Sequence, residues 1–353
     1  MSRLPDLDVA IIGAGPAGST AARILAPHAA VTVIDPVFAG AATKPCGGLL
    51  SEAAQKSLAA LDLVVPHELL VTPQCFAVRT VDLAQGVAGL YPRTYTNLDR
   101  RRFDDYLRSL IPASVRREAV RVSDVKREQG CFRLMLEDAG RLREVTCRRL
   151  IAADGGGSRV RRALYPALTA NTLTAVQAHF PAGDFPAEYA CYYDHRCTPA
   201  CGWSLVKDDR LIVGGAFARQ GASAAFAAFE AAVFRQLGRP APARLKTEAC
   251  PVVWPLKAAD LLLGDDDVLF AGEAAGLISA SAFEGMSFSL ESGYAAARAI
   301  LSGQPRAAAY RRAIGYLLDK HRLRRIKARL LANRRLRAWI IRSGVAQVRP
   351  KAR

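Results

Sequence analysis

The chain has 353 residues, 51% of them hydrophobic, and a formal net charge of +17. This length and composition predict a globular protein with a substantial core and exclude a disordered or fibrous one. The eight cysteines are scattered along a chain too long for a disulfide-stapled secreted domain, and no run of about 18 apolar residues suggests a membrane span. We therefore expect a cytoplasmic protein with reduced thiols.

The positive charge is concentrated at one end of the chain. Residues 320–353 contain thirteen Lys and Arg and no Asp or Glu, whereas the other 36 Lys and Arg are nearly balanced by 32 Asp and Glu. Apolar residues recur in this segment near helical spacing, with arginines between them, at Leu323, Ile326, Leu330, Leu336, Trp339 and Ile340.

Three interpretations of this basic segment remain open. Its helices could dock on the body with solvated arginines, or they could contact anionic lipid, which would make the protein peripheral at the inner face of the membrane. The third interpretation is nucleic-acid binding. We expect no nucleic-acid partner, because no recognised binding module accompanies the charge.

The first elements form a βαβ pattern. A buried strand is predicted over 7–13, a helix of small residues over 16–26 and a second strand over 31–35. A loop rich in Gly, Pro and Cys then leads into a helix over 51–61. Short strands are predicted next at 75–82, 131–137 and 145–152, with a helix over 102–110 between the first two.

A longer β-rich block follows, and a glycine turn brings the chain back to a buried strand and a helix. The strands of the block are predicted at 173–180, 188–194, 202–206, 211–217 and, after a helix over 222–237, at 249–254. The last buried strand is predicted over 268–272, and its helix runs from near 284 to 301.

The predicted fold class is α/β. Glycine turns that precede helices occur near 13, 154 and 272, with antiparallel-looking strands between them. This order predicts a Rossmann-like nucleotide-binding domain with a parallel sheet, interrupted by a mainly antiparallel β-sheet substrate domain and followed by C-terminal helices. The expected segments are 1–74, 96–165 and 262–315 for the nucleotide domain, 75–95 and 166–261 for the substrate domain, and 316–353 for the basic extension.

The most specific motif is the glycine loop after the first strand, Gly13-Ala14-Gly15-Pro16-Ala17-Gly18. Gly13 permits a tight turn, Gly15 lets the backbone approach a pyrophosphate, and Gly18 lets helix and strand pack closely. The helix that begins at Pro16 and Ala17 presents free N–H groups to the phosphates. Asp35, at the end of the next strand, suits a ribose hydroxyl. This loop predicts a dinucleotide but does not choose between NAD and FAD.

Four further segments bear on the choice between NAD and FAD. These segments are Lys44-Pro45-Cys46-Gly47-Gly48, Arg100 with Phe103-Asp104, Asp154-Gly155, and Gly272-Glu273-Ala274-Ala275-Gly276. Together they resemble the geranylgeranyl reductase-like branch of the FAD-dependent oxidoreductases, relatives of the aromatic-ring hydroxylases, and within it the CbrA-type proteins. The resemblance implies FAD as cofactor. In the last segment Glu273 replaces the aspartate of the family.

By this resemblance the FAD-binding residues are the following: Gly13, Gly15, Pro16, Ala17, Gly18, Asp35, Pro45, Cys46, Gly47, Gly48, Arg100, Asp154, Gly155, Gly272, Glu273, Gly276, Gly285 and Met286. A helix starting near Gly285 would direct backbone N–H groups to the N1–C2=O edge of the flavin. Cys46 is the candidate catalytic residue beside the flavin. The alternative is a small residue that only fills a tight loop.

The substrate-binding candidates are Trp203 and Gly215. They lie in Gly202-Trp203-Ser204 and Val213-Gly214-Gly215, which resemble the substrate hairpin of the same family. We expect no metal site, because the spacing of Cys191, Cys197 and Cys201 does not match that of metal ligands.

The resemblance implies an FAD-dependent oxidoreductase that reduces carbon–carbon double bonds of an isoprenoid or other hydrophobic or lipid substrate. Electrons would come from NAD(P)H or another reduced donor. Because the chain has one Rossmann loop, NAD(P)H would bind only transiently. Two alternatives remain open, an FAD- and O2-dependent monooxygenase (less favoured, a halogenase) and a weakly catalytic flavoprotein that binds or carries lipid.

Overall fold

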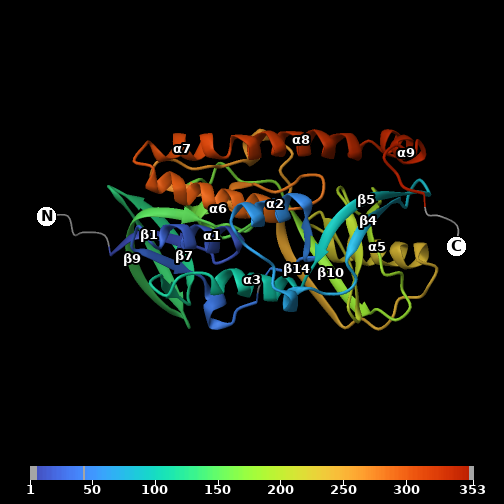
Figure 1. Ribbon diagram of the computed structural model, residues 1–353, viewed down its shortest axis with the longest axis horizontal. Coiled ribbons are helices and arrows are strands. Elements are labelled where there is room, and N and C mark those ends of the chain that lie inside the picture. Colours follow the sequence, from blue (N-terminus) through green and yellow to red (C-terminus); the bar gives the residue numbers. More distant parts are fainter. Residues whose placement is uncertain (1–5, 43, 350–353) are drawn as a thin grey trace.

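The computed structural model describes residues 6–42 and 44–349. The predicted segments also include residues 1–5, 43 and 350–353, which lie outside the described residues. Figure 1 shows two sheets side by side along the long axis, with the helices α7 (Arg306–Ala313), α8 (Gly315–Ala332) and α9 (Arg334–Arg342) running across the top of both.

The first sheet contains β1 (Leu7–Ile12), β2 (Val31–Ile34), β6 (Arg116–Glu118), β7 (Arg121–Glu128), β8 (Cys131–Asp138), β9 (Arg141–Ala152) and β15 (Val268–Phe270). Its order is β6-β2-β1-β9-β8-β7, with β15 paired to β9. β9 pairs twice along its length. Its first part pairs antiparallel with β8, and its last residues pair in parallel with β1 and β15. The parallel strands β1, β2 and β15 are almost wholly buried, as a sheet covered on both faces requires, whereas β6, at the edge, is largely exposed.

The helices α1 (Pro16–Leu25), α4 (Arg159–Leu164) and α6 (Met286–Leu301) pack against this sheet. Outside them, α2 (Glu52–Ala60) packs on α6, and α3 (Arg100–Ser109) packs on α1. α1 and α6 pack so closely that a Cβ at Gly293 would lie 2.2 Å from the carbonyl oxygen of Ala17. Any side chain at Gly293 would therefore separate α6 from the helix that follows the glycine loop.

The second sheet has the order β14-β10-β13-β12-β11-β4-β5-β3. Its strands are β3 (Leu49–Ser51), β4 (Cys75–Asp82), β5 (Val87–Asn97), β10 (Thr172–Pro181), β11 (Tyr189–Tyr193), β12 (Gly202–Lys207), β13 (Arg210–Phe217) and β14 (Lys246–Val253). All neighbours are antiparallel except β11 and β4. α5 (Ala222–Gln236) covers one face, where Phe226 and Phe229 pack against Phe217.

The predicted fold class is confirmed, an α/β fold with a mainly parallel sheet, a mainly antiparallel sheet and C-terminal helices. Strands β3, β5, β6 and β7 were not predicted. β3 pairs with β5 and therefore belongs to the second sheet, although it falls within the segment 1–74 assigned to the nucleotide domain. The chain thus enters the second sheet before residue 75.

The C-terminal helices dock on the body through a different face from the predicted apolar row. The buried residues of α8 are Leu317, His321 and Ala328, and in α9 the buried Arg337 forms an ion pair of 2.8 Å with Asp82. Most of the apolar row points away from the body, as the exposed Leu323, Ile326, Leu330 and Trp339 demonstrate. None of the described helices is long and apolar enough to cross a membrane.

Candidate functional site

The predicted motifs meet because each follows a parallel strand of the first sheet. Gly13 follows β1, Asp35 follows β2, Asp154 follows β9 and Gly272 follows β15. Parallel strands end at the same edge of a sheet, where open α/β folds bind their ligands. At this edge lies a cleft of about 350 Å³.

Ten of the predicted FAD-binding residues line this cleft: Gly13, Gly15, Pro16, Ala17, Asp35, Arg100, Asp154, Gly155, Gly272 and Glu273. The other eight do not line it: Gly18, Pro45, Cys46, Gly47, Gly48, Gly276, Gly285 and Met286. Further lining residues were not assigned to the site from the sequence: Lys44, Asp104, Arg108, Arg121, Arg159 and Ser289.

The three glycines of the loop differ in what surrounds them. Gly13 has a φ of +103°, and a Cβ there would lie 2.4 Å from the carbonyl oxygen of Ala153. A Cβ at Gly18 would lie 1.8 Å from the carbonyl oxygen of Gly13, so Gly18 holds the helix against the loop. A Cβ at Gly15 would meet no atom of the described residues within 4 Å, although Gly15 lines the cleft. Gly15 therefore leaves open space next to the backbone.

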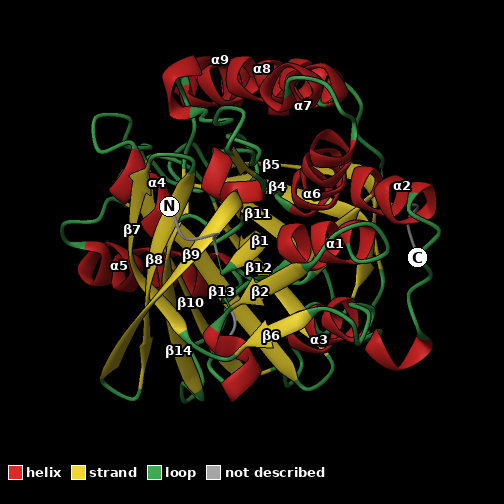
Figure 2. Cartoon of the chain, turned by 90° about the vertical axis from the view of Figure 1, so that its left-hand side faces the viewer, coloured by secondary structure: helices red, strands yellow, loops and turns green. Residues whose placement is uncertain are grey.

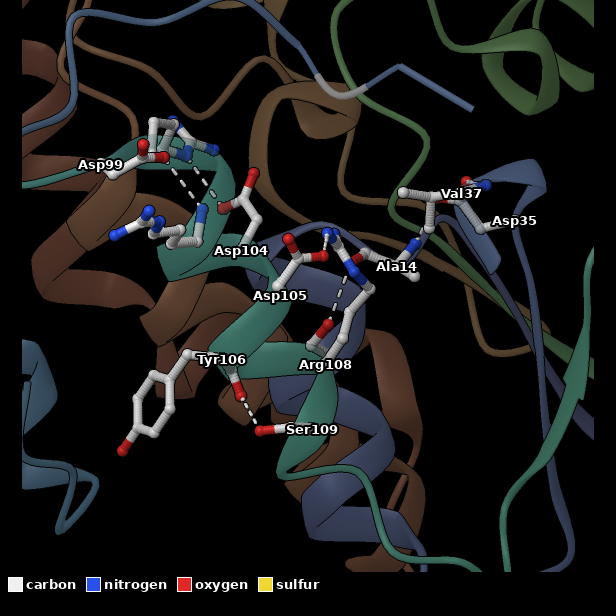
Figure 3. A network of polar contacts seen from close by, with 12 residues as sticks. Ala14, Asp35, Val37, Asp99, Asp104, Asp105, Tyr106, Arg108 and Ser109 are labelled. Carbon is white, nitrogen blue, oxygen red and sulfur yellow. Dashed lines mark hydrogen bonds and ion pairs between the residues drawn. The ribbon is translucent and has the colours of Figure 1, made fainter. Parts of the chain in front are cut away.

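Asp35 and Arg108 fix the glycine loop from two sides (Figure 3). The Asp35 carboxylate accepts hydrogen bonds from the N–H groups of Ala14 at 2.6 Å and Val37 at 2.8 Å. Arg108 of α3 donates to the carbonyl oxygen of Ala14 at 3.3 Å and to the Asp105 carboxylate at 2.6 Å. Asp35 thus positions the loop as well as lining the cleft.

Asp154 presents an unpartnered oxygen at the cleft. Its Oδ2 accepts from the N–H of Arg159 at 2.7 Å and of Val160 at 3.2 Å, at the start of α4. Its Oδ1 is buried and has no hydrogen-bond partner among the described residues. Burial raises the pKa of Asp154 above its ordinary value. An unpaired buried acceptor is costly, and a hydroxyl donor on a ligand would remove that cost.

Glu273 joins three segments of the site. One oxygen accepts from the N–H of Val253 at 2.9 Å, at the end of β14, and the other forms an ion pair with Lys44. Although burial disfavours a charge on Lys44, the Glu273 carboxylate raises the pKa of that lysine. The glutamate therefore ties the Cys46 loop (residues 44–48) to the first sheet and to β14.

Cys46 is an exposed residue whose thiol lies in a positively charged environment. Desolvation opposes its ionisation, but the charges of Arg100 and Lys44 and the N–H of Gly48 together hold the pKa of Cys46 below its ordinary value. Arg100 is itself paired with Asp104 at 2.9 Å. Because Arg100 lines the cleft, it connects the thiol to the dinucleotide site.

Lys207, from the end of β12, reaches the Cys46 loop across the molecule. Its Nζ donates to Oδ1 of Asn97 and to the carbonyl oxygen of Leu98, both at 2.6 Å. Burial lowers the pKa of Lys207 to about 8. A Cβ at Gly48, whose φ is +66°, would lie 2.8 Å from this Nζ and 2.5 Å from the Leu98 oxygen. Gly48 is therefore required for the second sheet to approach the loop.

We call the face of the second sheet that carries Tyr189, Cys191, Trp203 and Leu205 its inner face. These residues share a face because alternate residues of a strand point the same way and Cys191 pairs with Trp203. A Cβ at Gly47 would lie 3.6 Å from Cδ2 of Leu205, so the inner face meets the Cys46 loop. The indole nitrogen of Trp203 is buried, and none of the residues that the structure describes accepts a hydrogen bond from it.

The two predicted substrate residues do not share a face. Trp203 is on the inner face, opposite Gly214, whereas Gly215 pairs with Gly202 on the face that α5 covers. A Cβ at Gly215 would lie 2.8 Å from the Phe217 ring. The prediction that Gly215 contacts substrate together with Trp203 is therefore corrected, since Gly215 allows an aromatic side chain to pack beneath the sheet.

The remaining predicted residues lie beside the cleft. α6 begins at Met286 after Gly285, and Glu284 accepts from the N–H of Ser287 at 2.9 Å, so one amide of this helix start is already partnered. A Cβ at Gly276 would lie 2.5 Å from the carbonyl oxygen of Asp260. Close backbone packing is sufficient to explain that glycine.

Sequence signals existed for some of the residues that were missed. Lys44 belongs to the quoted loop motif, and Arg108 lies two helical turns after Arg100 on α3. Arg121, in contrast, belongs to the unpredicted strand β7. No local pattern connects Arg121 with the glycine loop.

Two observations indicate that the cleft fits the pyrophosphate and the hydroxyl groups of FAD. The open space beside Gly15 allows a phosphate to approach the backbone at the start of α1, and the orphaned Oδ1 of Asp154 offers an acceptor to a hydroxyl. The basic side chains of Arg108 and Arg159 at the cleft suit an anionic ligand.

Comparisons with known proteins agree with this fold. A model of the lycopene cyclase protein family matches residues 8–180. Protein CbrA of Escherichia coli O6:H1 (strain CFT073) is 38% identical over 352 residues, covering 97% of this chain and 94% of that protein. Protein CbrA of Shigella sonnei is also 38% identical over 352 residues, and the match covers 97% of this chain and 98% of that protein.

Solved structures show the same architecture. A geranylgeranyl bacteriochlorophyll reductase-like protein from Thermoplasma acidophilum matches with a TM-score of 0.76 at 17% identity, covering 92% of this chain and 87% of that one. PqsL, a probable FAD-dependent monooxygenase from Pseudomonas aeruginosa, matches with a TM-score of 0.67 at 17% identity, covering 96% and 99%. The chain therefore belongs to the CbrA family and has the fold of FAD-dependent oxidoreductases.

Proposed function

We propose that this protein binds FAD in the cleft and reduces a carbon–carbon double bond of an isoprenoid or other hydrophobic substrate. The observation that carries the proposal is the meeting of the Cys46 loop, Arg100 and the inner face of the second sheet beside the dinucleotide cleft. FAD, when bound, would supply the two electrons for this reduction, taken from NAD(P)H or another reduced donor.

The aromatic and aliphatic side chains of the inner face suit an apolar substrate. Tyr95 and Tyr189 pack edge to face with ring centroids 5.3 Å apart, and Trp203 and Leu205 extend the same surface. The indole nitrogen of Trp203 packs against Gly214, where a Cβ would lie 2.7 Å from it, so the ring lies on the sheet and offers its apolar surface. Such a wall excludes water and leaves the alkene to be held by shape.

Cys46 is the candidate proton donor for the second alkene carbon. Cys46 is an exposed residue, and although desolvation opposes ionisation of its thiol, nearby cations hold its pKa below the ordinary value, which makes it a stronger acid than a free thiol. Lys207 and Gly48 would hold the loop in place. The proton leaves Sγ for carbon, and water restores it.

The test uses purified protein loaded with FAD, reduced without oxygen and incubated with polyprenyl alcohols and their phosphates. A product heavier by the mass of two hydrogens for each reduced double bond, identified by mass spectrometry, supports the proposal. Cys46→Ala should retain FAD and lose turnover, whereas the control Cys131→Ala, on β8, should keep both.

Two other outcomes would replace the proposal. Substrate-stimulated NAD(P)H oxidation with oxygen consumed and a hydroxylated product would identify a monooxygenase. Bound FAD that every donor reduces slowly, together with tight lipid binding, would identify a lipid-carrying flavoprotein.

A further inference from the structure

The outer faces of α8 and α9 form an exposed apolar row inside the most basic part of the chain. Four side chains, which we call the apolar ridge, define it: Leu323, Ile326, Leu330 and Trp339. Leu323 is 66% and Trp339 64% exposed. Large apolar side chains at this density on an outer surface usually mark an interaction site.

Helical geometry places the ridge opposite the docked face. At 3.6 residues per turn, Leu323, Ile326 and Leu330 lie on one side of α8, and the buried His321 and Ala328 lie on the other. The ridge therefore plays no part in holding α8 on the body. Figures 1 and 2 show that α8 and α9 lie along the same side of the molecule, as a layer above the sheets.

Basic residues flank the ridge on both sides. Around the α8 axis, Arg322 lies on one side of the leucines and Lys327 on the other, and both are exposed. On α9, Arg335 lies about one turn before Trp339 and Arg342 about one turn after it, and both are exposed too. The segment 320–353 has thirteen Lys and Arg and no Asp or Glu, so nothing within it neutralises this charge.

From this arrangement we infer that α8 and α9 dock on an anionic lipid surface. The ridge would enter the boundary between headgroups and acyl chains, and the flanking Arg and Lys would contact the headgroups. Each basic residue near an anionic membrane contributes about 1 kcal/mol, so a few of them with the apolar ridge are sufficient for reversible binding. Charge alone would not explain the exposed Leu323, Ile326 and Leu330. The inference does not depend on the proposed reaction.

The test is co-sedimentation of the purified full chain with vesicles of phosphatidylcholine alone and of phosphatidylcholine with phosphatidylglycerol. We expect binding only to the anionic vesicles, weakening as NaCl is raised. Trp339 should be quenched by brominated lipid, and Trp339→Phe should remove most of that quenching.

A matched pair of double variants separates the ridge from general surface hydrophobicity. Leu323→Gln with Leu330→Gln should weaken anionic vesicle binding about tenfold or more. Leu142→Gln with Leu245→Gln, which alters residues 63% and 58% exposed elsewhere, should bind as wild type does. Circular dichroism checks that both remain folded, as expected for exposed positions.

Three results would overturn the inference. The first is that the wild-type protein does not bind anionic vesicles. The second is that the two double variants bind equally well. The third is that duplex DNA binds as tightly as anionic vesicles and is unaffected by the leucine changes, which would make this a nucleic-acid surface.

Discussion

Gly15 offers a clean test of the dinucleotide site, because the structure separates its effect on binding from its effect on folding. Gly15 precedes α1 with φ −74° and ψ −174°, a conformation that alanine also adopts. In the part of the chain that the structure describes, a methyl group there would meet no atom within 4 Å. The Gly15→Ala variant should therefore lose no more than about 1 kcal/mol of unfolding free energy, the cost of alanine at a helix N-cap.

FAD binding should respond far more strongly. The added methyl group would occupy the space through which a phosphate reaches the backbone N–H groups at the start of α1. Losing one hydrogen bond to a charged group costs about 1.5–3 kcal/mol, which is roughly a 10- to 100-fold weaker Kd. Titration of the apo protein with FAD, followed by flavin fluorescence, and thermal melting without FAD measure the two effects separately.

Two other glycines provide the comparison. Gly315, the first residue of α8, also has no atom within 4 Å of a built Cβ and lies outside the cleft, so Gly315→Ala should bind FAD normally. Gly18→Ala should lose both stability and FAD, because its Cβ would collide with the Gly13 carbonyl. If Gly15→Ala binds FAD as tightly as the wild type, the assignment of the phosphate site is wrong.

Three further predictions follow from the electrostatics. Asp154→Asn should weaken FAD binding about tenfold with little change in melting temperature, because an amide N–H group would replace the unpartnered Oδ1 acceptor. If a titration gives the same Kd for the variant and the wild type, this prediction is wrong. Alkylation of Cys46 by iodoacetamide should reach half its maximal rate at a pH below the ordinary pKa of a thiol. Arg100→Gln should raise that pH, and if the pH does not change, Arg100 is not what lowers the pKa of Cys46. Burial and the nearby Arg325 lower the pKa of the buried His321 to about 4. The unfolded state therefore binds the proton first as pH falls from about 6.5 to 4, and unfolding free energy should drop by about 3 kcal/mol; chemical denaturation of His321→Leu should lack this drop.

Much of the dinucleotide site could be predicted because its signals are local. The strand, glycine turn, helix and terminal Asp35 lie within about 30 consecutive residues, the span of one βαβ unit. The roles of Gly13, Gly15 and Gly18 follow from the tight turn and the close approaches of the backbone that a strand, a glycine turn and a helix in direct succession require. Asp154 and Gly272 were found for the same reason, as each comes directly after a buried strand.

The missed strands depend on partners distant in sequence. β7 is rich in charged residues and buries only Val122 and Val125, so its pairing with β8 determines its conformation more than its composition does. β5 contains Pro92 and many exposed residues, and β4 and β3 hold it on either side. Local patterns cannot reveal strands of this kind.

The sequence by itself determined the nucleotide loop, the fold class and the concentration of charge near the C-terminus, because these are properties of neighbouring residues. Only the tertiary structure decided that Lys207 contacts the Cys46 loop at Gly48, a residue 159 positions earlier in the sequence. It also placed Trp203 and Gly215 on opposite faces of the second sheet. It also decided which side of α8 is buried, since an amphipathic helix with two candidate faces docks by the one whose shape fits the body. That choice left Leu323 and Leu330 exposed.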